Sequence, residues 1–114
     1  MPNISAANRT RTNAIRELND AFRKSFRGGK IFVTPGVTMR HDLPEIVQRV
    51  RDYDTFDQGN DPYGEHDFGT LKIGDDALFW KIDCYDLDMQ HASPYPADPN
   101  VTCRVLTVML AEEY

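Results

Sequence analysis

The sequence has no long apolar run. Its longest uninterrupted apolar segments, such as 108–111, are far shorter than the ~20 residues that a membrane-spanning helix needs. No apolar stretch of the kind found in signal peptides follows Met1. We therefore expect a cytoplasmic protein without membrane contact. The chain has only two cysteines, Cys84 and Cys103, and in a reducing compartment we expect both to stay reduced as small core residues.

The common signatures of nucleotide-binding, zinc-binding and hydrolytic proteins are also missing. The chain contains no GxxxxGKS/T phosphate loop, no GxGxxG, no CxxC pair, no HExxH and no GxSxG. These absences weaken the case for an enzyme, and we expect no cofactor. They do not exclude an active site, because catalytic residues converge in space and not in sequence.

What is present is an ordinary globular composition with an uneven distribution of charge. With 114 residues, 40% of them hydrophobic and 27% charged, the chain fits a single domain over residues 1–114, with 1–5 as a candidate disordered end. The net charge is −5. Segment 1–41 nevertheless holds eight basic residues against two acidic ones, whereas 42–98 holds fourteen acidic residues against four basic ones. The chain is therefore bipolar.

Helical spacing appears in two segments. The apolar positions of the first recur at steps of three and four: Ile15, Leu18, Phe22 and Phe26. This spacing predicts a helix over 6–26, ended by Gly28 and Gly29. A second apolar stripe, preceded by Asp42 as an N-terminal cap, predicts a helix over 43–53.

Three β-prone runs predict three strands, at 30–34, 68–73 and 77–85. The Gly-Asp-Asp turn predicts a hairpin of the last two, and large aromatic residues on both faces of 77–85 predict that it is central. After a polar loop, Asp98 as a cap with Pro99 at the first position predicts a last helix, although the β-branched valines that follow leave a strand open. The expected fold is α+β, in the order α-β-α-β-β-α, with helices packed on a small antiparallel three-stranded sheet.

The densest polar motif covers residues 60–67 and contains three carboxylates and one imidazole. An imidazole beside carboxylates can act as a general base or bind a divalent metal, so Glu65, His66 and Asp67 are candidate catalytic residues, and His66 and Asp67 candidate metal ligands. A metal site would need further ligands from other parts of the chain. The candidates are His41, His91, Asp83 and Asp86, but the sequence does not show whether they lie next to the motif. The structural alternative is that Asn60 and Asp61 bind loop amides as in Asx turns.

Lys81 and Asp83 form a second candidate pair, two residues apart on one face of the predicted central strand. A lysine whose pKa is depressed by burial can act as a nucleophile. The alternative is an ion pair on a half-exposed face of the sheet.

Two charged surfaces are candidates for binding. The N-terminal helix carries a series of basic residues that can meet phosphates or pair with the acidic middle of the chain. The acidic residues lie mostly in loops and turns, where they can contact a protein partner: Asp54, Asp57, Asp61, Glu65, Asp75, Asp76, Asp86 and Asp88. An acidic surface also simply favours solubility. We expect a protein partner and no direct binding of nucleic acid, and sequence leaves open whether loops 54–67 and 86–98 form one surface.

Several segments resemble one protein family. They are NDPYGEHDFG (60–69), FWKIDCYDLDM (79–89) and SPYPADPNVTCRVLTVMLAEEY (93–114), with RELNDAFR and GGKIFVTPGV before them. They resemble the bacterial family called domain of unknown function 3768, over nearly the whole chain. The resemblance implies a small protein of alphaproteobacterial genomes, often carried on plasmids or other mobile elements. It implies no activity, cofactor or catalytic residue. Cys84 stands where the family motif has an aromatic residue, which argues against a shared thiol role.

These observations lead to three functional hypotheses. The first is a non-enzymatic protein-interaction module, carried by a mobile element, that inhibits a host defence nuclease or nucleic-acid-binding complex through its acidic loops. The second is a small metal-dependent or acid–base hydrolase that uses the Gly-Glu-His-Asp motif. The third is a DNA-binding accessory protein that uses the basic N-terminal helix.

Overall fold

A computed structural model describes residues 6–114, so the expected disorder of 1–5 lies outside the described part of the chain. The described residues form three α-helices, four strands and a short 3-10 helix. The helices are α1 (Ala6–Ser25), α2 (Pro35–Thr38) and α3 (Leu43–Arg51), and the 3-10 helix is η1 (Ala111–Glu113). The strands are β1 (Gly29–Val33), β2 (Phe68–Ile73), β3 (Asp76–Tyr85) and β4 (Cys103–Leu110). No helix in this part of the chain is long and apolar enough to cross a membrane.

Helix α1 follows the predicted stripe and turns Ile15 and Phe22 into the core. The chain leaves the helix through two residues with positive φ, Phe26 at 59° and Gly28 at 99°. Gly29 then begins β1, where a Cβ atom would lie 2.7 Å from the Phe22 ring. The close approach of helix and strand at this point therefore requires a glycine.

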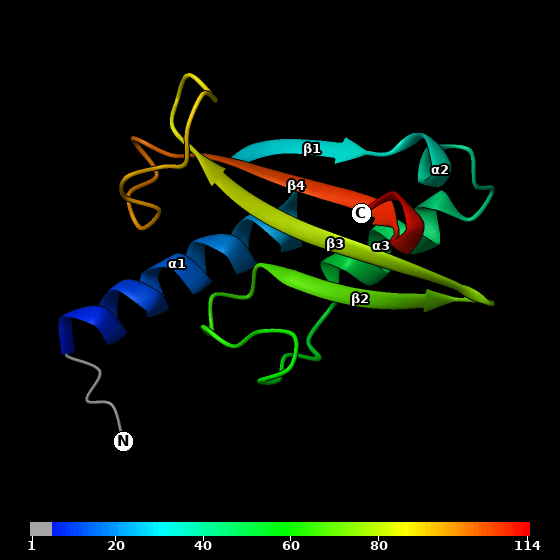
Figure 1. Cartoon of the computed structure of the whole chain (residues 1–114), viewed down its shortest axis with the longest axis horizontal. Coiled ribbons are helices and arrows are strands. Elements are labelled where there is room, and N and C mark those ends of the chain that lie inside the picture. Colours follow the sequence, from blue (N-terminus) through cyan, green and yellow to red (C-terminus); the bar gives the residue numbers. More distant parts are fainter. Residues whose placement is uncertain (1–5) are drawn as a thin grey trace.

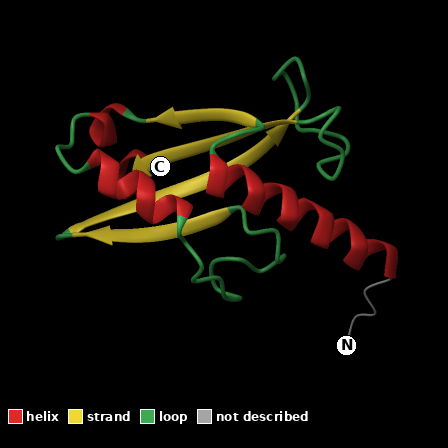
Figure 2. Ribbon diagram, turned by 180° about the vertical axis from the view of Figure 1, so that it is seen from behind, coloured by secondary structure: helices red, strands yellow, loops and turns green. Residues whose placement is uncertain are grey.

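The four strands form one mixed sheet in the order β1-β4-β3-β2. Strand β1 runs parallel to β4, whereas the β4–β3 and β3–β2 pairs are antiparallel. Helices α1 and α3 cover one face of the sheet, whereas the face turned to the viewer in Figure 1 carries the short η1 and none of the three described α-helices (Figures 1 and 2). The α+β class and the β2–β3 hairpin are thus confirmed, and β3 is one of the two interior strands.

The prediction of a three-stranded antiparallel sheet was wrong, because residues 103–110 form a strand and not a helix. Strand β4 lies between β1 and β3, and its side chains are covered on both faces: Val105 and Met109 on one face and Leu106 and Val108 on the other are all buried. Burial on both faces removes the alternation that marks a half-exposed strand. The Asp98 carboxylate starts no helix but accepts a hydrogen bond from the Asn100 amide (2.9 Å), as in an Asx turn.

The cap expected at Asp42 also differs from the structure. Asp42 does precede α3, but its side chain makes no capping hydrogen bond. Both of its oxygens bind the guanidinium of Arg40 (2.9 Å each), which holds the pKa of the Asp42 carboxyl below its usual range. Both cysteines are free and half-buried, and burial raises the pKa of the Cys84 thiol.

The core between the helices and the sheet is centred on Trp80, which is fully buried. The Tyr53 and Phe56 rings meet the Trp80 ring edge-on, with ring centroids 5.4 and 6.1 Å away, and Arg23 lies over its face. Tyr53 lies two residues after the end of α3. The core therefore holds the start of the 54–67 loop as well as the helices.

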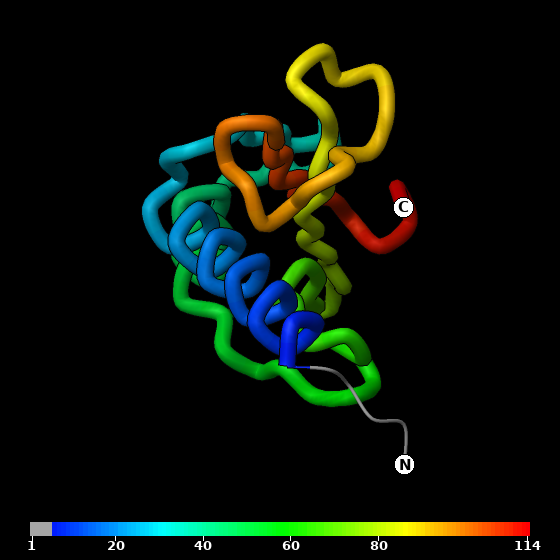
Figure 3. The backbone as a smooth tube through the Cα atoms, turned by 90° about the vertical axis from the view of Figure 1, so that its left-hand side faces the viewer, coloured from blue at the N-terminus to red at the C-terminus, as the bar shows by residue number. Residues whose placement is uncertain are grey.

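The two long loops lie on either side of α1 and do not form one surface (Figures 1 and 3). A buried chain of hydrogen bonds joins them through the interior. The Asn19 amide donates to the Glu65 carbonyl (2.9 Å) in one loop and accepts from Arg104 Nε (2.8 Å), and Arg104 donates to the Pro96 carbonyl (2.5 Å) in the other. Burial lowers the pKa of the Arg104 guanidinium.

Candidate functional site

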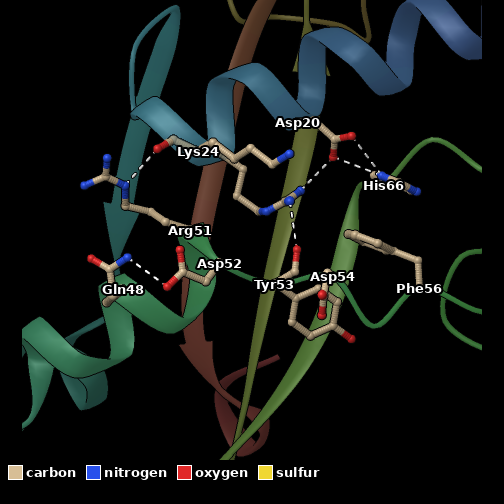
Figure 4. A pocket seen from close by; sticks show the side chains of 10 residues that line it. Asp20, Lys24, Gln48, Arg51, Asp52, Tyr53, Asp54, Phe56 and His66 are labelled. Carbon is tan, nitrogen blue, oxygen red and sulfur yellow. Dashed lines mark hydrogen bonds and ion pairs between the residues drawn. The ribbon is translucent and has the colours of Figure 1, made fainter.

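A hollow of about 510 Å³ lies between the C-terminal half of α1, the end of α3 and the 54–67 loop (Figure 4). We call it the α1–α3 hollow. It is lined by Asp20, Arg23, Lys24, Gln48, Arg51, Asp52, Tyr53, Asp54, Phe56 and His66. A second hollow of about 460 Å³ adjoins it and shares Asp52, Tyr53 and Asp54. These shared residues line both hollows.

Arg23 is the buried centre of the α1–α3 hollow, with 1% of its surface exposed. Its Nε donates to the Val50 carbonyl (3.1 Å), and its two terminal nitrogens donate to the Tyr53 carbonyl (2.9 Å) and to Asp20 (3.0 Å). Arg23 therefore fixes the end of α3 against α1, and its cation is neutralised by a carboxylate from the same helix.

His66 meets Asp20 from the other side. Its Nδ1 lies 2.9 Å from Asp20 Oδ1, and its Nε2 faces Asp61 Oδ2 at 3.7 Å. The ring stacks on Phe56 at a centroid distance of 3.7 Å and an interplanar angle of 3°. His66 also adopts a positive φ of 53°, so the backbone holds the imidazole in this place against a local conformational preference.

The 54–67 loop has no regular secondary structure, yet side chains anchor it along its length. Its turn at 57–60 is closed by the Asp57 carboxylate, which accepts from the amides of Gly59 (2.8 Å) and Asn60 (3.0 Å). Asn60 donates to the Tyr53 hydroxyl (3.2 Å), and Arg16 on α1 donates to the Gly64 carbonyl (3.2 Å). Asn60 and Asp61 bind loop amides as expected, although not in Asx turns: Asn60 Oδ1 accepts from the Asp57 amide (3.0 Å) and Asp61 Oδ1 from the His66 amide (3.1 Å).

Glu65 and Asp67 lie beside His66 in sequence but do not face the α1–α3 hollow. Glu65 lines a separate hollow of about 350 Å³ next to Tyr63 and the N-terminal half of α1. Burial raises the pKa of both carboxyls. Repulsion by neighbouring carboxylates raises it further: Asp67 and Asp61 act on Glu65, and Asp61 and Asp83 act on Asp67. The three candidate residues of the motif thus diverge, and only His66 points into the α1–α3 hollow.

Lys81 and Asp83 form the expected ion pair (3.0 Å), but on the face of the sheet opposite α1 and α3. The hydrogen bond to Asp83 raises the pKa of Lys81. A nucleophilic lysine needs a shift in the opposite direction. The pair is also separated from His66 by the sheet itself.

The eight acidic residues expected to contact a partner are spread over the molecule. Asp54 and Asp57 are exposed at the α1–α3 hollow or its neighbour, whereas Asp61 is buried and Glu65 half-buried. Asp75 and Asp76 lie at the β2–β3 turn, where Asp76 pairs with Arg40. Asp86 and Asp88 belong to the other long loop, in which Asp86 accepts from the Gln90 amide (3.0 Å).

The main polar partner that sequence reasoning missed is Asp20, which joins Arg23 to His66. An Asp–His pair can orient an imidazole for proton transfer. Here the second ring nitrogen faces the nearly buried Asp61, and no hydroxyl or thiol of the described residues is hydrogen-bonded to His66. Residues 6–114 also contain no group of three or more His, Cys, Asp or Glu side chains arranged to hold a metal ion. The contact between His66 and Asp20 therefore holds the 54–67 loop against α1.

Comparison with known proteins gave one match. A protein-family model described as "Protein of unknown function (DUF3768)" matches residues 12–113, nearly the whole chain. The resemblance read from the sequence motifs is thereby confirmed. Searches of curated proteins and of solved structures gave no significant match.

Proposed function

We propose that this chain, which belongs to the DUF3768 family of proteins of unknown function, is a non-enzymatic protein-interaction module. We place its contact surface on an acidic rim, defined as the exposed residues Asp52, Asp54 and Asp57 around the two adjoining hollows. The observation that carries the proposal is that the 54–67 loop is irregular and firmly anchored while the three rim residues are exposed.

Anchoring matters because long irregular loops are uncommon in small domains and are usually functional. Here α1, Tyr53 and the loop's own side chains fix the backbone before any partner arrives. Binding to a fixed loop avoids the entropy loss of ordering it. Asp54 makes no hydrogen bond or ion pair with the described residues, so its carboxylate is available to a partner.

The partner class that fits an acidic rim is a protein with a basic surface, such as a channel lined by Lys and Arg that normally holds nucleic acid. In this proposal the protein inhibits a host defence nuclease or a nucleic-acid-binding complex, and it is carried by a mobile element. Long-range attraction would speed association, and added salt would weaken it. Of the eight acidic residues that the sequence offered as partner contacts, only Asp54 and Asp57 belong to this rim.

The test is competition for DNA by purified restriction and interference complexes, measured by gel shift and by cleavage at low and high salt. We expect the protein to displace DNA from its target, with the effect reduced at high salt. The double substitution Asp54→Asn and Asp57→Asn should weaken inhibition about tenfold, because asparagine can still close the turn at 57–60 but carries no charge. Asp75→Asn with Asp88→Asn removes the same charge elsewhere and should leave inhibition intact.

Two results would contradict this proposal. Unchanged DNA binding by every candidate complex, at low as well as high salt, would remove the inhibitor function. Equal loss of inhibition in both double variants would show that net charge acts and the rim does not. Capture of partners by the tagged protein at low salt, with elution at high salt, supplies the candidate complexes for this test.

A further inference from the structure

The two edges of the sheet differ in how far they are closed. Strands β1 and β2 are the edge strands. On the β2 edge, the Thr70 amide donates to the Tyr53 hydroxyl (3.4 Å), and the Lys72 carbonyl accepts from Arg49 (3.3 Å). Side chains therefore occupy two of the outward backbone groups of β2, one amide and one carbonyl. This is a usual way to prevent a further strand from pairing with an edge.

The β1 edge is open at its centre. Val33 is paired with Val108, and the Thr34 amide donates to the Val108 carbonyl (3.1 Å). In a parallel pair this register turns the backbone groups of Ile31 and Val33 outward. The Val33 carbonyl accepts from the Thr38 hydroxyl (3.3 Å), whereas no side chain of the described residues hydrogen-bonds to the backbone of Ile31. In Figures 1 and 2, β1 forms the outer margin of the sheet.

The side chains of β1 are also poorly covered. None of its five residues is buried, and the Phe32 side chain is 51% exposed on the face opposite α1 and α3. Strand addition uses main-chain hydrogen bonds together with side-chain contacts. Strand β1 offers both, because it leaves an aromatic side chain and outward amide and carbonyl groups exposed.

Charge decides which occupant fits. The chain has no acidic residue between Asp20 and Asp42, and Arg27 and Lys30 are exposed at or next to the start of β1. The nearest carboxylate bonded to this region, Glu113, binds Thr34 and Gly36 beyond the end of the strand. A second copy would bring the same basic residues together, whereas an acidic strand would be attracted.

We propose that the outer edge of β1 binds an extended acidic segment of a partner protein as a fifth strand of the sheet. The bonds would run to the amide and carbonyl of Ile31 and to the amide of Val33. This edge is separate from the acidic rim, and the proposal does not depend on it.

The experiment uses the full chain and a synthetic peptide that alternates valine and glutamate, with a valine–lysine peptide as the control probe. Amide exchange measured by NMR should slow at Ile31 and Val33 in the presence of the acidic peptide, and the affinity from fluorescence anisotropy should fall with added salt. The valine–lysine peptide should not bind.

Three variants locate the effect. Lys30→Glu should weaken binding about fivefold, whereas Lys72→Glu, which makes the same change on the closed β2 edge, should leave it unchanged. Ile31→Pro removes an outward amide without removing a bond to β4, so it should reduce binding at least about tenfold in a folded protein.

The proposal is overturned if exchange at Ile31 and Val33 does not change, if the lysine peptide binds as well as the acidic one, or if both lysine variants lose affinity equally. It is also overturned if analytical ultracentrifugation shows a dimer that Lys30→Glu dissociates or rearranges, since the edge would then serve a second copy. If Ile31→Pro does not fold, the comparison of Lys30→Glu with Lys72→Glu and the exchange data still test the proposal.

Discussion

Gly69 shows how closely the residues around Trp80 are packed. A Cβ atom at this position would overlap the Trp80 indole nitrogen and lie 2.7 Å from Tyr53 Cζ. The Trp80 nitrogen is buried and has no hydrogen-bond partner among the described residues. Only a residue without a side chain lets β2 approach both rings.

We therefore expect Gly69→Ala to lower the free energy of unfolding by about 1–3 kcal/mol, the usual range for overpacking a core. Urea denaturation measures this change. Thr70→Ala is the control, because Thr70 is exposed on the same strand, and it should stay within about 0.5 kcal/mol of the parent. Similar stability of Gly69→Ala and the parent would show that the rings can move apart.

His66 is the second residue whose role can be tested alone. His66→Ala removes the bond to Asp20 and the stacking on Phe56, so we expect a loss of about 1–3 kcal/mol and faster amide exchange within 54–67. Urea denaturation and hydrogen exchange measure the two effects. The matched variant His91→Ala alters a largely exposed imidazole and should change neither. Unaltered exchange in the loop would mean that His66 does not hold it.

At the scale of elements, Glu113 in η1 ties the C-terminal end to the turn between β1 and α2. One of its oxygens accepts from the Thr34 hydroxyl (2.6 Å) and the Leu110 amide (2.9 Å), and the other accepts from the Gly36 amide (3.1 Å). These donors hold the pKa of the Glu113 carboxyl below its usual range. A depressed pKa means that the stabilisation is present above the unfolded-state pKa and is lost as the pH falls through the folded-state pKa.

We expect Glu113→Gln to lower the melting temperature at pH 7. A carboxamide has one acceptor oxygen, so it cannot replace both carboxylate oxygens as acceptors. The difference from the parent should shrink as the pH falls below about 4, where glutamate also becomes protonated. Thermal melts between pH 7 and pH 3 give the comparison. Glu112→Gln, an exposed neighbour with no bond to the turn, is the control. A difference that stays constant with pH would contradict the assignment.

Which elements could be predicted depended on how they are exposed. Helix α1 and the β2–β3 hairpin have one covered and one exposed face, so their periodicity was readable in the sequence. Strand β4 is buried on both faces, and its valines happened to match helical spacing. Its β-branched residues were the signal that pointed to a strand.

The candidate site was predictable only in part, for a similar reason. His66 stood out because an imidazole lay among carboxylates that are close in sequence. Asp20, its actual partner, comes from a helix 46 positions away, and nothing in the spacing of α1 distinguishes Asp20 from a solvent-exposed acid. Glu65 and Asp67 were adjacent in sequence, but the turn that carries His66 points them elsewhere.

At the scale of the whole molecule, the chain of hydrogen bonds from Glu65 through Asn19 and Arg104 to Pro96 connects two loops across the core. Asn19→Leu leaves Arg104 Nε without its partner in the interior, so we expect a loss of about 2–4 kcal/mol. Arg104→Met should destabilise the protein by a similar amount. The double variant should lose less free energy of unfolding than the sum of the two single variants. In the double variant neither group is left buried without its partner.

Chemical denaturation of the parent, both single variants and the double variant completes this thermodynamic cycle. Strictly additive losses would show that Asn19 and Arg104 stabilise the protein independently.

The position of β4 bears on the order in which the chain folds. The hairpin of β2 and β3 can form from neighbouring residues, but β1 can join the sheet only through β4, with Gly29 opposite Arg104. Closing so long a loop is slow, and contacts of this kind lower folding rates. During synthesis, β1 therefore has no sheet partner until β4 has been made. A chain ending at Thr102 should retain some helical circular dichroism but show no cooperative unfolding, since the missing strand is the one that joins β1 to the β2–β3 hairpin.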